Sequence, residues 1–317
     1  MKPLLRPGTT VVRRSARTLQ IGTVPGASVV VADRPGVVAV LRGADGTRDL
    51  DTIAATSGQP RALVVEAASS LLEAGAVLDA RTWDDVPGTP LVDEARALAA
   101  RGWSRADVSA QMRARAAAAV EIASDTPTGD LADRLGEILS AAGVPAAQKP
   151  LEAPSLVVVL SAGPSPRDAF DVLTGGGVSH LPVVCEADRV RVGPLVRPGL
   201  TPCVRCDDVD RSGYEPSWPF VLEQLARPIA QATPSHPHAL DTLTAYAVAV
   251  HLAHLVLAFC DGRPSPADSA VQLLGLAGHT ASTTAVALQP DCPCQILTPG
   301  TAFDPRVRVA RGVRMTA

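Results

Sequence analysis

The chain has 317 residues, a formal net charge of −3 and only three Trp, two Tyr and four Phe. This length exceeds what one small core occupies, so we expect two domains, each with its own core. Acidic and basic residues are interspersed and aromatic residues are scarce, so the composition excludes a typical nucleic-acid-binding surface. No apolar signal core follows the N-terminal segment MKPLLRPGTTVVRRS, so we expect a cytoplasmic protein.

Residues 1–81 are expected to form one small domain. Their β-rich runs, helical patterns and closing strand lie, in chain order, at residues 9–15, 18–22, 28–33, 35–41, 49–56, 61–74 and 76–79. Three strands, three helices and a final strand make a winged-helix-like α+β domain. The third helix carries one Arg and two Glu, which attract phosphate poorly. The expected ligand is therefore a peptide rather than DNA.

The predicted peptide site is an edge of the small sheet. Residues 28–32 are rich in Val and follow a Pro-Gly turn, so at a sheet edge their backbone groups accept an added strand. The expected contacts are Ser28, Val29, Val30 and Val31, with Arg61 on the third helix available to acidic side chains of the peptide. The alternative is that the protein itself covers this edge.

Residues 82–90, TWDDVPGTP, have the composition of a linker, and residues 91–317 are expected to form an α/β domain. Predicted strands alternate with helices at residues 120–123, 130–142, 156–161, 167–175, 180–185 and 189–196. Such alternation is typical of a parallel sheet. Residues 242–260 contain no Asp, Glu, Lys or Arg but lack flanking Lys/Arg clusters, so a buried core or interface helix is expected and no membrane span.

The loop after the first strand of this domain is unsuited to a nucleotide. A phosphate-binding loop needs glycines for close backbone approach, but EIASDTPTGDLADRLG offers Gly129 alone before the helix. Asp125 and Asp130 also bring negative charge to the place of the phosphates. The sequence contains no HExxH, GxSxG or Walker pattern either, so we assign no catalytic residue and expect no ATP binding of the usual kind.

Four of the six cysteines form two tight pairs, Cys203/Cys206 and Cys292/Cys294. A tetrahedral zinc ion takes four thiolates, and two short knuckles supply them with little loop strain. The alternatives are two unrelated surface pairs or a redox pair. A redox pair is disfavoured because a Pro-Gly turn rather than a strand precedes the first pair. The remaining two cysteines lie in apolar runs and are expected in the core.

Three segments carry a resemblance to a known family: GPLVRPGLTPCVRC (193–206), SWPFVLEQL (217–225) and QPDCPC (289–294). Together they resemble the C-terminal region of ThiF-like, ubiquitin-activating-type proteins of bacteriocin and thiazole/oxazole-modified peptide clusters. The resemblance implies a degenerate Rossmann-type domain and a zinc ion bound by Cys203, Cys206, Cys292 and Cys294. The N-terminal unit similarly resembles the PqqD-like element that recognises precursor leader peptides.

The resemblance implies a recognition role rather than catalysis. Catalytic members of the family adenylate a carboxylate with a glycine-rich loop, from which this sequence departs. In cyclodehydratase partner proteins with the same loss, the ThiF-like chain binds the leader peptide and presents the substrate to a YcaO-type enzyme that uses ATP. We therefore expect a non-catalytic partner protein, with a homodimer as a possible state. The alternatives are an active adenylating enzyme with a divergent loop and a zinc-stabilised scaffold that binds another cellular protein.

Overall fold

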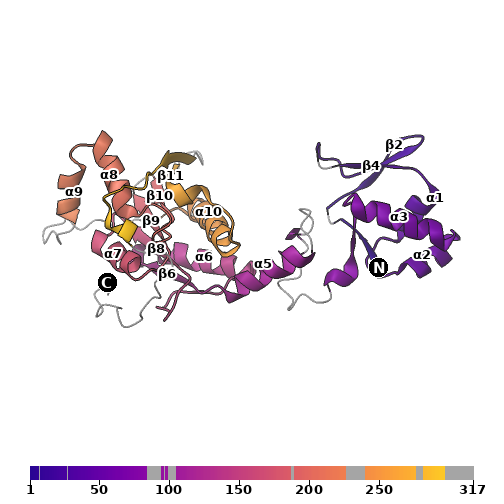
Figure 1. Cartoon of the computed structure of the whole chain (residues 1–317), viewed down its shortest axis with the longest axis horizontal. Coiled ribbons are helices and arrows are strands. Elements are labelled where there is room, and N and C mark those ends of the chain that lie inside the picture. Colours follow the sequence, from indigo (N-terminus) through magenta and orange to yellow (C-terminus); the bar gives the residue numbers. More distant parts are fainter. Residues whose placement is uncertain are drawn as a thin grey trace. The chain divides into compact units, whose positions relative to one another are not determined.

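The computed structural model describes residues 1–6, 8–26, 28–83, 94–95, 97–98, 105–186, 189–225, 240–275 and 281–296. The chain divides into two compact units, Met1–Arg113 and Ala114–Ala317 (Figure 1). The predicted linker at 82–90 lies outside the described residues from position 84 onward.

The first unit contains a three-stranded antiparallel sheet in the order β2-β3-β4. Its strands β2 (Val11–Ser15), β3 (Thr18–Ile21) and β4 (Val29–Ala32) confirm the three predicted runs. The predicted closing strand is also present as β5 (Val77–Asp79). It pairs, however, with β1 (Pro3–Leu5), a strand that the sequence analysis did not predict, in a separate two-stranded sheet.

The three predicted helices of this unit are α1 (Pro35–Gly43), α2 (Leu50–Ser57) and α3 (Arg61–Glu73). The side chain of Asp49 caps α2 by accepting a 2.8 Å hydrogen bond from the Thr52 N–H. Helices α1 and α3 approach closely at Gly36, where a Cβ atom would lie 2.7 Å from the Leu63 carbonyl oxygen. The helices and the sheet enclose a core that includes Ile21, Val40, Ile53, Val64 and Leu71.

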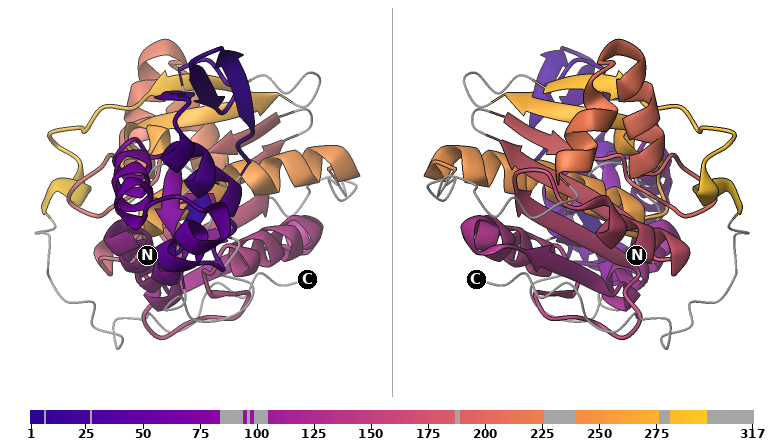
Figure 2. Two further views of the ribbon diagram at one scale, coloured as in Figure 1. Left: turned by 90° about the vertical axis from the view of Figure 1, so that its right-hand side faces the viewer. Right: turned by 90° about the vertical axis from the view of Figure 1, so that its left-hand side faces the viewer.

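The second unit is built on a twisted sheet, seen in Figure 2. The sheet has seven strands in the order β12-β11-β10-β9-β8-β6-β7. Its strands are β6 (Val120–Ser124), β7 (Ala146–Ala147), β8 (Leu156–Ala162), β9 (His180–Glu186), β10 (Arg189–Val192), β11 (Ala270–Gly275) and β12 (Ala281–Ala285). The first four are parallel to one another, whereas β10, β11 and β12 pair antiparallel. The prediction of a parallel sheet is therefore wrong for its second half. Only two residues separate β9 from β10, which is too few for the crossover that parallel pairing requires.

The helices described from residue 105 onward are α5 (Arg105–Ala117), α6 (Gly129–Ala141), α7 (Arg167–Gly175), α8 (Val204–Tyr214), α9 (Trp218–Leu225) and α10 (Thr242–Cys260). Helices α6 and α10 pack on one face of the sheet, in the larger core cluster, which also contains Leu156, Val158 and Leu160 of β8. The intervening Val159 points to the other face. There it packs against a smaller cluster that contains Phe170 of α7 and the four paired cysteines. The cysteines therefore lie on the face of the sheet opposite to α6 and α10.

Helix α10 confirms the expected core helix. Among the described helices it is the one long and apolar enough to cross a membrane, judged by length and composition alone. Half of that apolar window is buried, and Val248, Leu252 and Val256 lie in the larger core cluster. Beyond its C-terminus, Asp261 accepts two hydrogen bonds of 2.8 and 3.0 Å from Arg115 of α5.

Candidate metal centre and peptide-binding edge

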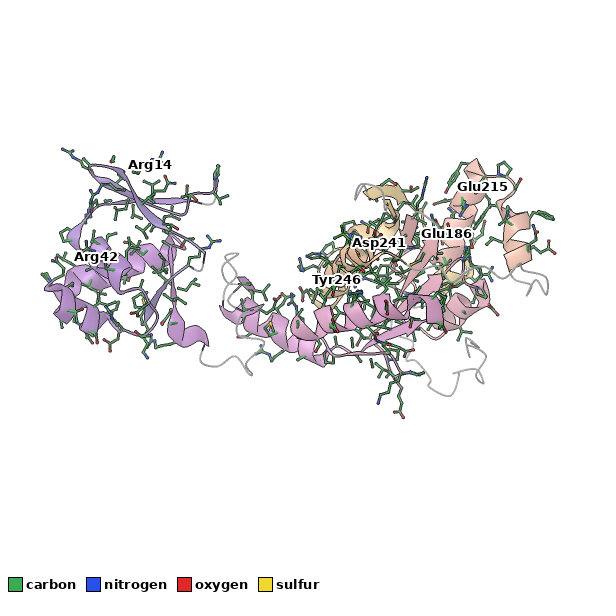
Figure 3. All side chains as sticks on the ribbon, turned by 180° about the vertical axis from the view of Figure 1, so that it is seen from behind. Arg14, Arg42, Glu186, Glu215, Asp241 and Tyr246 are labelled. Carbon is green, nitrogen blue, oxygen red and sulfur yellow. The ribbon has the colours of Figure 1, made fainter. Side chains whose placement is uncertain are left out.

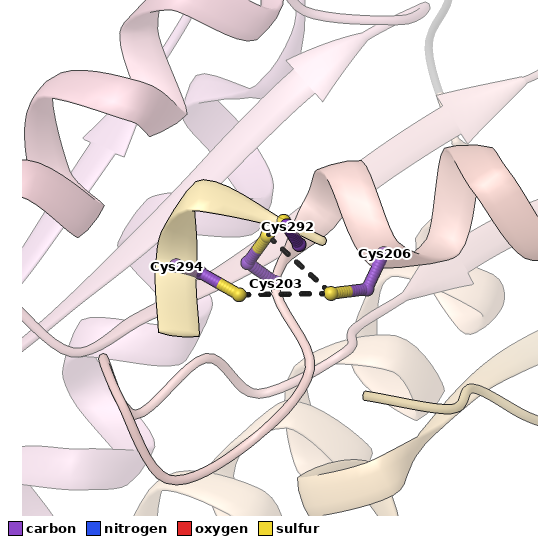
Figure 4. A group of neighbouring side chains, drawn as sticks. All are labelled: Cys203, Cys206, Cys292 and Cys294. Carbon is purple, nitrogen blue, oxygen red and sulfur yellow. Dashed lines mark hydrogen bonds between the residues drawn. The ribbon is translucent and has the colours of Figure 1, made fainter. Parts of the chain in front are cut away.

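The two cysteine pairs meet in one buried cluster (Figure 4). Cys203 is the N-cap of α8 and Cys206 lies in its first turn, whereas Cys292 and Cys294 lie at the short helix η4 (Pro293–Ile296). All four residues are at most 7% exposed. The turn before Cys203 disfavours a redox pair on sequence grounds. The structure shows that the pair nevertheless begins a helix, so convergence of all four sulfurs is the stronger argument for a metal.

The distances between the sulfurs match a tetrahedral metal site. The Sγ atoms of Cys203 and Cys292 are 3.6 Å apart, those of Cys206 and Cys294 are 3.6 Å apart, and those of Cys203 and Cys206 are 3.9 Å apart. A tetrahedron with metal–sulfur bonds of about 2.3 Å has edges of about 3.8 Å. Disulfide bonds of about 2.05 Å are excluded at these distances. The four cysteines therefore fit a metal ion bound through sulfur.

Charge in the cluster also favours a cation. A hydrogen bond from the Cys203 thiol lowers the pKa of Cys206, whereas burial raises the pKa of Cys294. Several thiolates buried together repel one another unless a cation lies between them. Metal binding favours the deprotonated sulfurs, so it releases protons and weakens at low pH.

Helix α8 is held in place by three aspartates that closely follow the first cysteine pair. Asp207 accepts a 2.7 Å hydrogen bond from Arg191 of β10, and Asp208 accepts two of 2.8 Å from Arg167 of α7. Asp210 accepts hydrogen bonds from the backbone N–H of residue 287 at 2.7 Å and from the side chain of residue 289 at 2.5 Å. It therefore ties the first knuckle to the chain segment that leads to the second.

No role was predicted for these aspartates. The run DDVD beside the cysteines was the signal in the sequence, but no local pattern identifies their partners, which lie on other elements. Burial raises the pKa of Asp207 even though Arg191 opposes the shift. Asp208 also accepts a 3.0 Å hydrogen bond from the indole N–H of Trp218, which fixes α9 on α8.

The carboxylate of Asp125 accepts the hydrogen bonds that hold the loop after β6. Asp125 accepts hydrogen bonds from the Thr128 N–H at 3.1 Å, the Thr128 hydroxyl at 2.7 Å and the Ala162 N–H at 2.7 Å. These donors stand at the ends of the parallel strands β6 and β8, where open α/β sheets bind ligands. The Asp125 carboxylate, which the sequence predicted at this place, is therefore held by hydrogen bonds within the protein.

Replacing Asp125 by Ala is expected to lower the free energy of unfolding by about 1–3 kcal/mol, because it leaves the partly buried Ala162 N–H without an acceptor and leaves the Thr128 donors with backbone carbonyls alone. Replacement by Asn retains one acceptor oxygen and should cost less. Chemical denaturation of both variants measures the difference, and inorganic phosphate should restore part of the stability of Asp125→Ala. An Asp125→Ala variant as stable as the wild type would contradict this role.

Strand β4 lies at an edge of the three-stranded sheet, as the sequence analysis expected of residues 28–32. The Asp33 N–H donates to the Arg17 carbonyl, and antiparallel pairing continues from residue 18 opposite residue 32. Opposite residues in an antiparallel pair of strands alternate between hydrogen-bonded and non-hydrogen-bonded. Since Asp33 is hydrogen-bonded, the backbone groups of Val31 and Val29 are hydrogen-bonded to β3 as well. The N–H and C=O groups of Val30 and of residue 28 therefore point away from β3, toward the open edge, whereas the carbonyl of residue 32 accepts a 3.0 Å hydrogen bond from the Arg34 N–H.

The side chains of the remaining predicted contacts differ in their exposure to solvent. Val29 and Val31 pack partly against the core, whereas Val30 is 46% exposed. Arg61 is exposed but pairs with Asp51 of α2, a partner that the sequence analysis missed because it lies on another helix. An exposed pair of this kind contributes little and exchanges readily, so Arg61 stays a predicted peptide contact.

No protein-family model and no curated protein sequence matches the chain. Solved structures share its fold. A heterocyclase in complex with substrate and cofactor matches 93% of this chain with a TM-score of 0.65 and 16% identity. The heterocyclase TruD matches 92% with a TM-score of 0.65 and 17% identity. The chain covers 39% and 42% of these two proteins, so it spans about two fifths of their length.

A second group of similar structures has the length of this chain. MccB of E. coli, solved with ATP, matches 93% of this chain and 100% of its own length, with a TM-score of 0.56 and 11% identity. At these identities the likeness concerns the fold alone. The resemblance predicted from the cysteine blocks is confirmed at that level.

Proposed function

We propose that this chain is a non-catalytic partner of a YcaO-type cyclodehydratase in the biosynthesis of thiazole- or oxazole-containing ribosomal peptides. In this proposal the first unit is a PqqD-like, winged-helix-like domain that binds the leader of the precursor. The second unit is a degenerate ThiF-like Rossmann-type domain with a structural zinc ion. The protein acts in the cytoplasm, and a homodimer is compatible with this role.

One observation carries the proposal: the outward-facing backbone groups of β4. An edge strand with free N–H and C=O groups accepts an extended peptide as a further strand. Leu63, 46% exposed on α3, supplies apolar surface on the helix that we propose as the other wall of the site. Main-chain bonds would provide affinity and side-chain contacts on α3 would provide selectivity.

The absence of catalysis is supported by Asp125. Its carboxylate occupies the Thr128 and Ala162 donors at the ends of the parallel strands, and the negative charge of a phosphate at that place would be repelled. The chain spans about two fifths of the length of the two heterocyclases. In this proposal the ATP-dependent step belongs to the YcaO-type enzyme and not to the ThiF-like unit.

Zinc is the proposed metal because four buried thiolates in a closed tetrahedral arrangement are typical of structural zinc sites. All four cysteines would hold the ion, which would stabilise the fold by joining α8 to η4. It leaves no open position for a substrate, so we assign it no chemistry.

A second candidate is an active adenylating enzyme. The likeness to MccB, which was solved with ATP and is matched over the whole length of MccB, favours this candidate. ATP–pyrophosphate exchange separates the two candidates, since an adenylating enzyme returns label from pyrophosphate to ATP when its peptide is present. The proposed partner role predicts exchange no faster than in a control without protein. Clear peptide-dependent exchange would replace the proposal by the active enzyme.

A further inference from the structure

The first unit contains a groove of about 700 Å³ that is separate from the edge of β4. It lies between α1, α2 and the end of the three-stranded sheet. Val38 of α1 and Ile53 of α2 contribute apolar surface to it, and Arg13, Arg42 and Arg48 also line it. Its volume is within the range of ligand-binding sites, about 300–1,000 Å³.

The charge of this groove is strongly one-sided. Three arginines line it against a single carboxylate, that of Asp33, which pairs with Arg13. Arg48 forms a 3.3 Å ion pair with Asp45, and both side chains are about half exposed. Arg42 has no hydrogen bond or ion pair with any part of the chain that the structure describes. At least one guanidinium is therefore available to an anionic ligand without the loss of an internal pair.

The groove and the proposed leader site occupy different faces of the unit. Side chains two residues apart along a strand point to the same face of the sheet. Arg13 is two residues from Val11 on β2, and Asp33 is two residues from Val31 of β4. The side chains of Val11 and Val31 pack toward the core. Arg13 and Asp33 therefore lie on the helix-facing side of the sheet, whereas the free backbone groups of residue 30 lie in the plane of the sheet at its edge. None of the predicted leader contacts lines the groove.

We infer that this groove binds an acidic peptide segment that carries an apolar side chain. Guanidinium groups bind carboxylates through two parallel hydrogen bonds, and three of them on β2, α1 and the α1–α2 connection can engage carboxylates spaced along one segment. The apolar floor accommodates a side chain between them. The inference concerns a site of its own and stands or falls separately from strand addition at β4.

A peptide fits this groove better than a nucleic acid. The carboxylate of Asp33 lies among the arginines and repels a continuous row of phosphates. The apolar floor also offers nothing to a phosphate backbone but complements Leu or Val side chains. The chain carries a net charge of −3, so the positive charge is local to the groove rather than general.

The test uses the full-length chain and a fluorescein-labelled peptide of alternating Glu and Leu, with a Gln/Leu peptide as the uncharged comparison. Fluorescence polarisation should show saturable binding of the Glu/Leu peptide that weakens as salt is raised. Arg42→Glu and Arg48→Glu should each raise Kd about tenfold or more, since each removes a charged hydrogen bond. Thermal melts confirm that every variant is folded.

Two control variants separate the groove from other binding. Arg14 neighbours Arg13 on β2 but does not line the groove, and Figure 3 labels it on the hairpin apart from Arg42 on α1. Arg14→Glu makes the same change of charge and should leave Kd within about twofold. Val30→Pro should also leave it unchanged, because the groove does not use the β4 edge.

Four outcomes overturn the inference. Equal weakening by Arg14→Glu would indicate general attraction between charges. Loss of binding in Val30→Pro would place the peptide on β4 instead. No saturable binding, or displacement by duplex DNA at lower concentrations than by unlabelled Glu/Leu peptide, would exclude an acidic peptide as the ligand of the groove.

Discussion

Replacing Cys203 or Cys292 by Ser is expected to remove the bound metal and to lower the free energy of unfolding by more than about 3 kcal/mol. Each change removes one of four thiolates from a closed site, and the fold then loses the link between α8 and η4. Metal analysis of the purified wild type should give about one zinc ion per chain. Thermal and chemical unfolding measure the loss of stability.

Cys260→Ser is the matched control. Cys260 is partly buried and packs against the larger core, but it does not belong to the cluster of four. This variant should therefore keep its metal and lose much less stability. The proposed metal site would be contradicted if the wild-type protein contained no metal, or if the serine variants of the cluster melted at the wild-type temperature.

Replacing Val30 by Pro is expected to abolish binding of the precursor leader while leaving the protein folded. The Val30 N–H points away from β3, so the change removes a donor from the open edge and none from the internal ladder. Val30→Ala keeps that donor and should weaken binding only slightly. Fluorescence polarisation of a labelled precursor encoded near this gene measures both variants.

Val11→Pro provides the opposite-edge control. The Gly22 N–H donates to the Thr10 carbonyl, so by alternation the Val11 N–H on β2 also points away from β3. Its removal should leave leader binding unchanged. If Val30→Pro bound as tightly as the wild type, the peptide would not add to β4, and the scaffold alternative would gain support.

Local patterns in the sequence were sufficient to predict most single elements. The periodicity of α6 and α7 and the apolar runs of β6, β8 and β9 are signals within each segment, and each is present where it was expected. The antiparallel strands β11 and β12 were missed. The pairing of β11 depends on contacts with β10, about 80 residues earlier, which no local pattern reports.

In the candidate sites, too, local features could be predicted from the sequence and long-range partners could not. The cysteine pairs were recognisable because their spacing is itself chemical information, and the fold brings their sulfurs together. The partners of Asp208 and Asp210, by contrast, lie on α7, α9 and the segment before η4. At β4 the sequence indicated an edge strand, but the direction of the Val30 N–H follows only from the register with β3.

The most direct test of the central claim is reconstitution of the modification reaction from purified components. The precursor, a YcaO-type enzyme encoded nearby and ATP are combined with and without this chain, and mass spectrometry measures the loss of one water per heterocycle formed. The account predicts efficient modification with the wild-type chain, little with Val30→Pro, and none with this chain and ATP when the YcaO-type enzyme is omitted. Equal modification with and without this chain would contradict it.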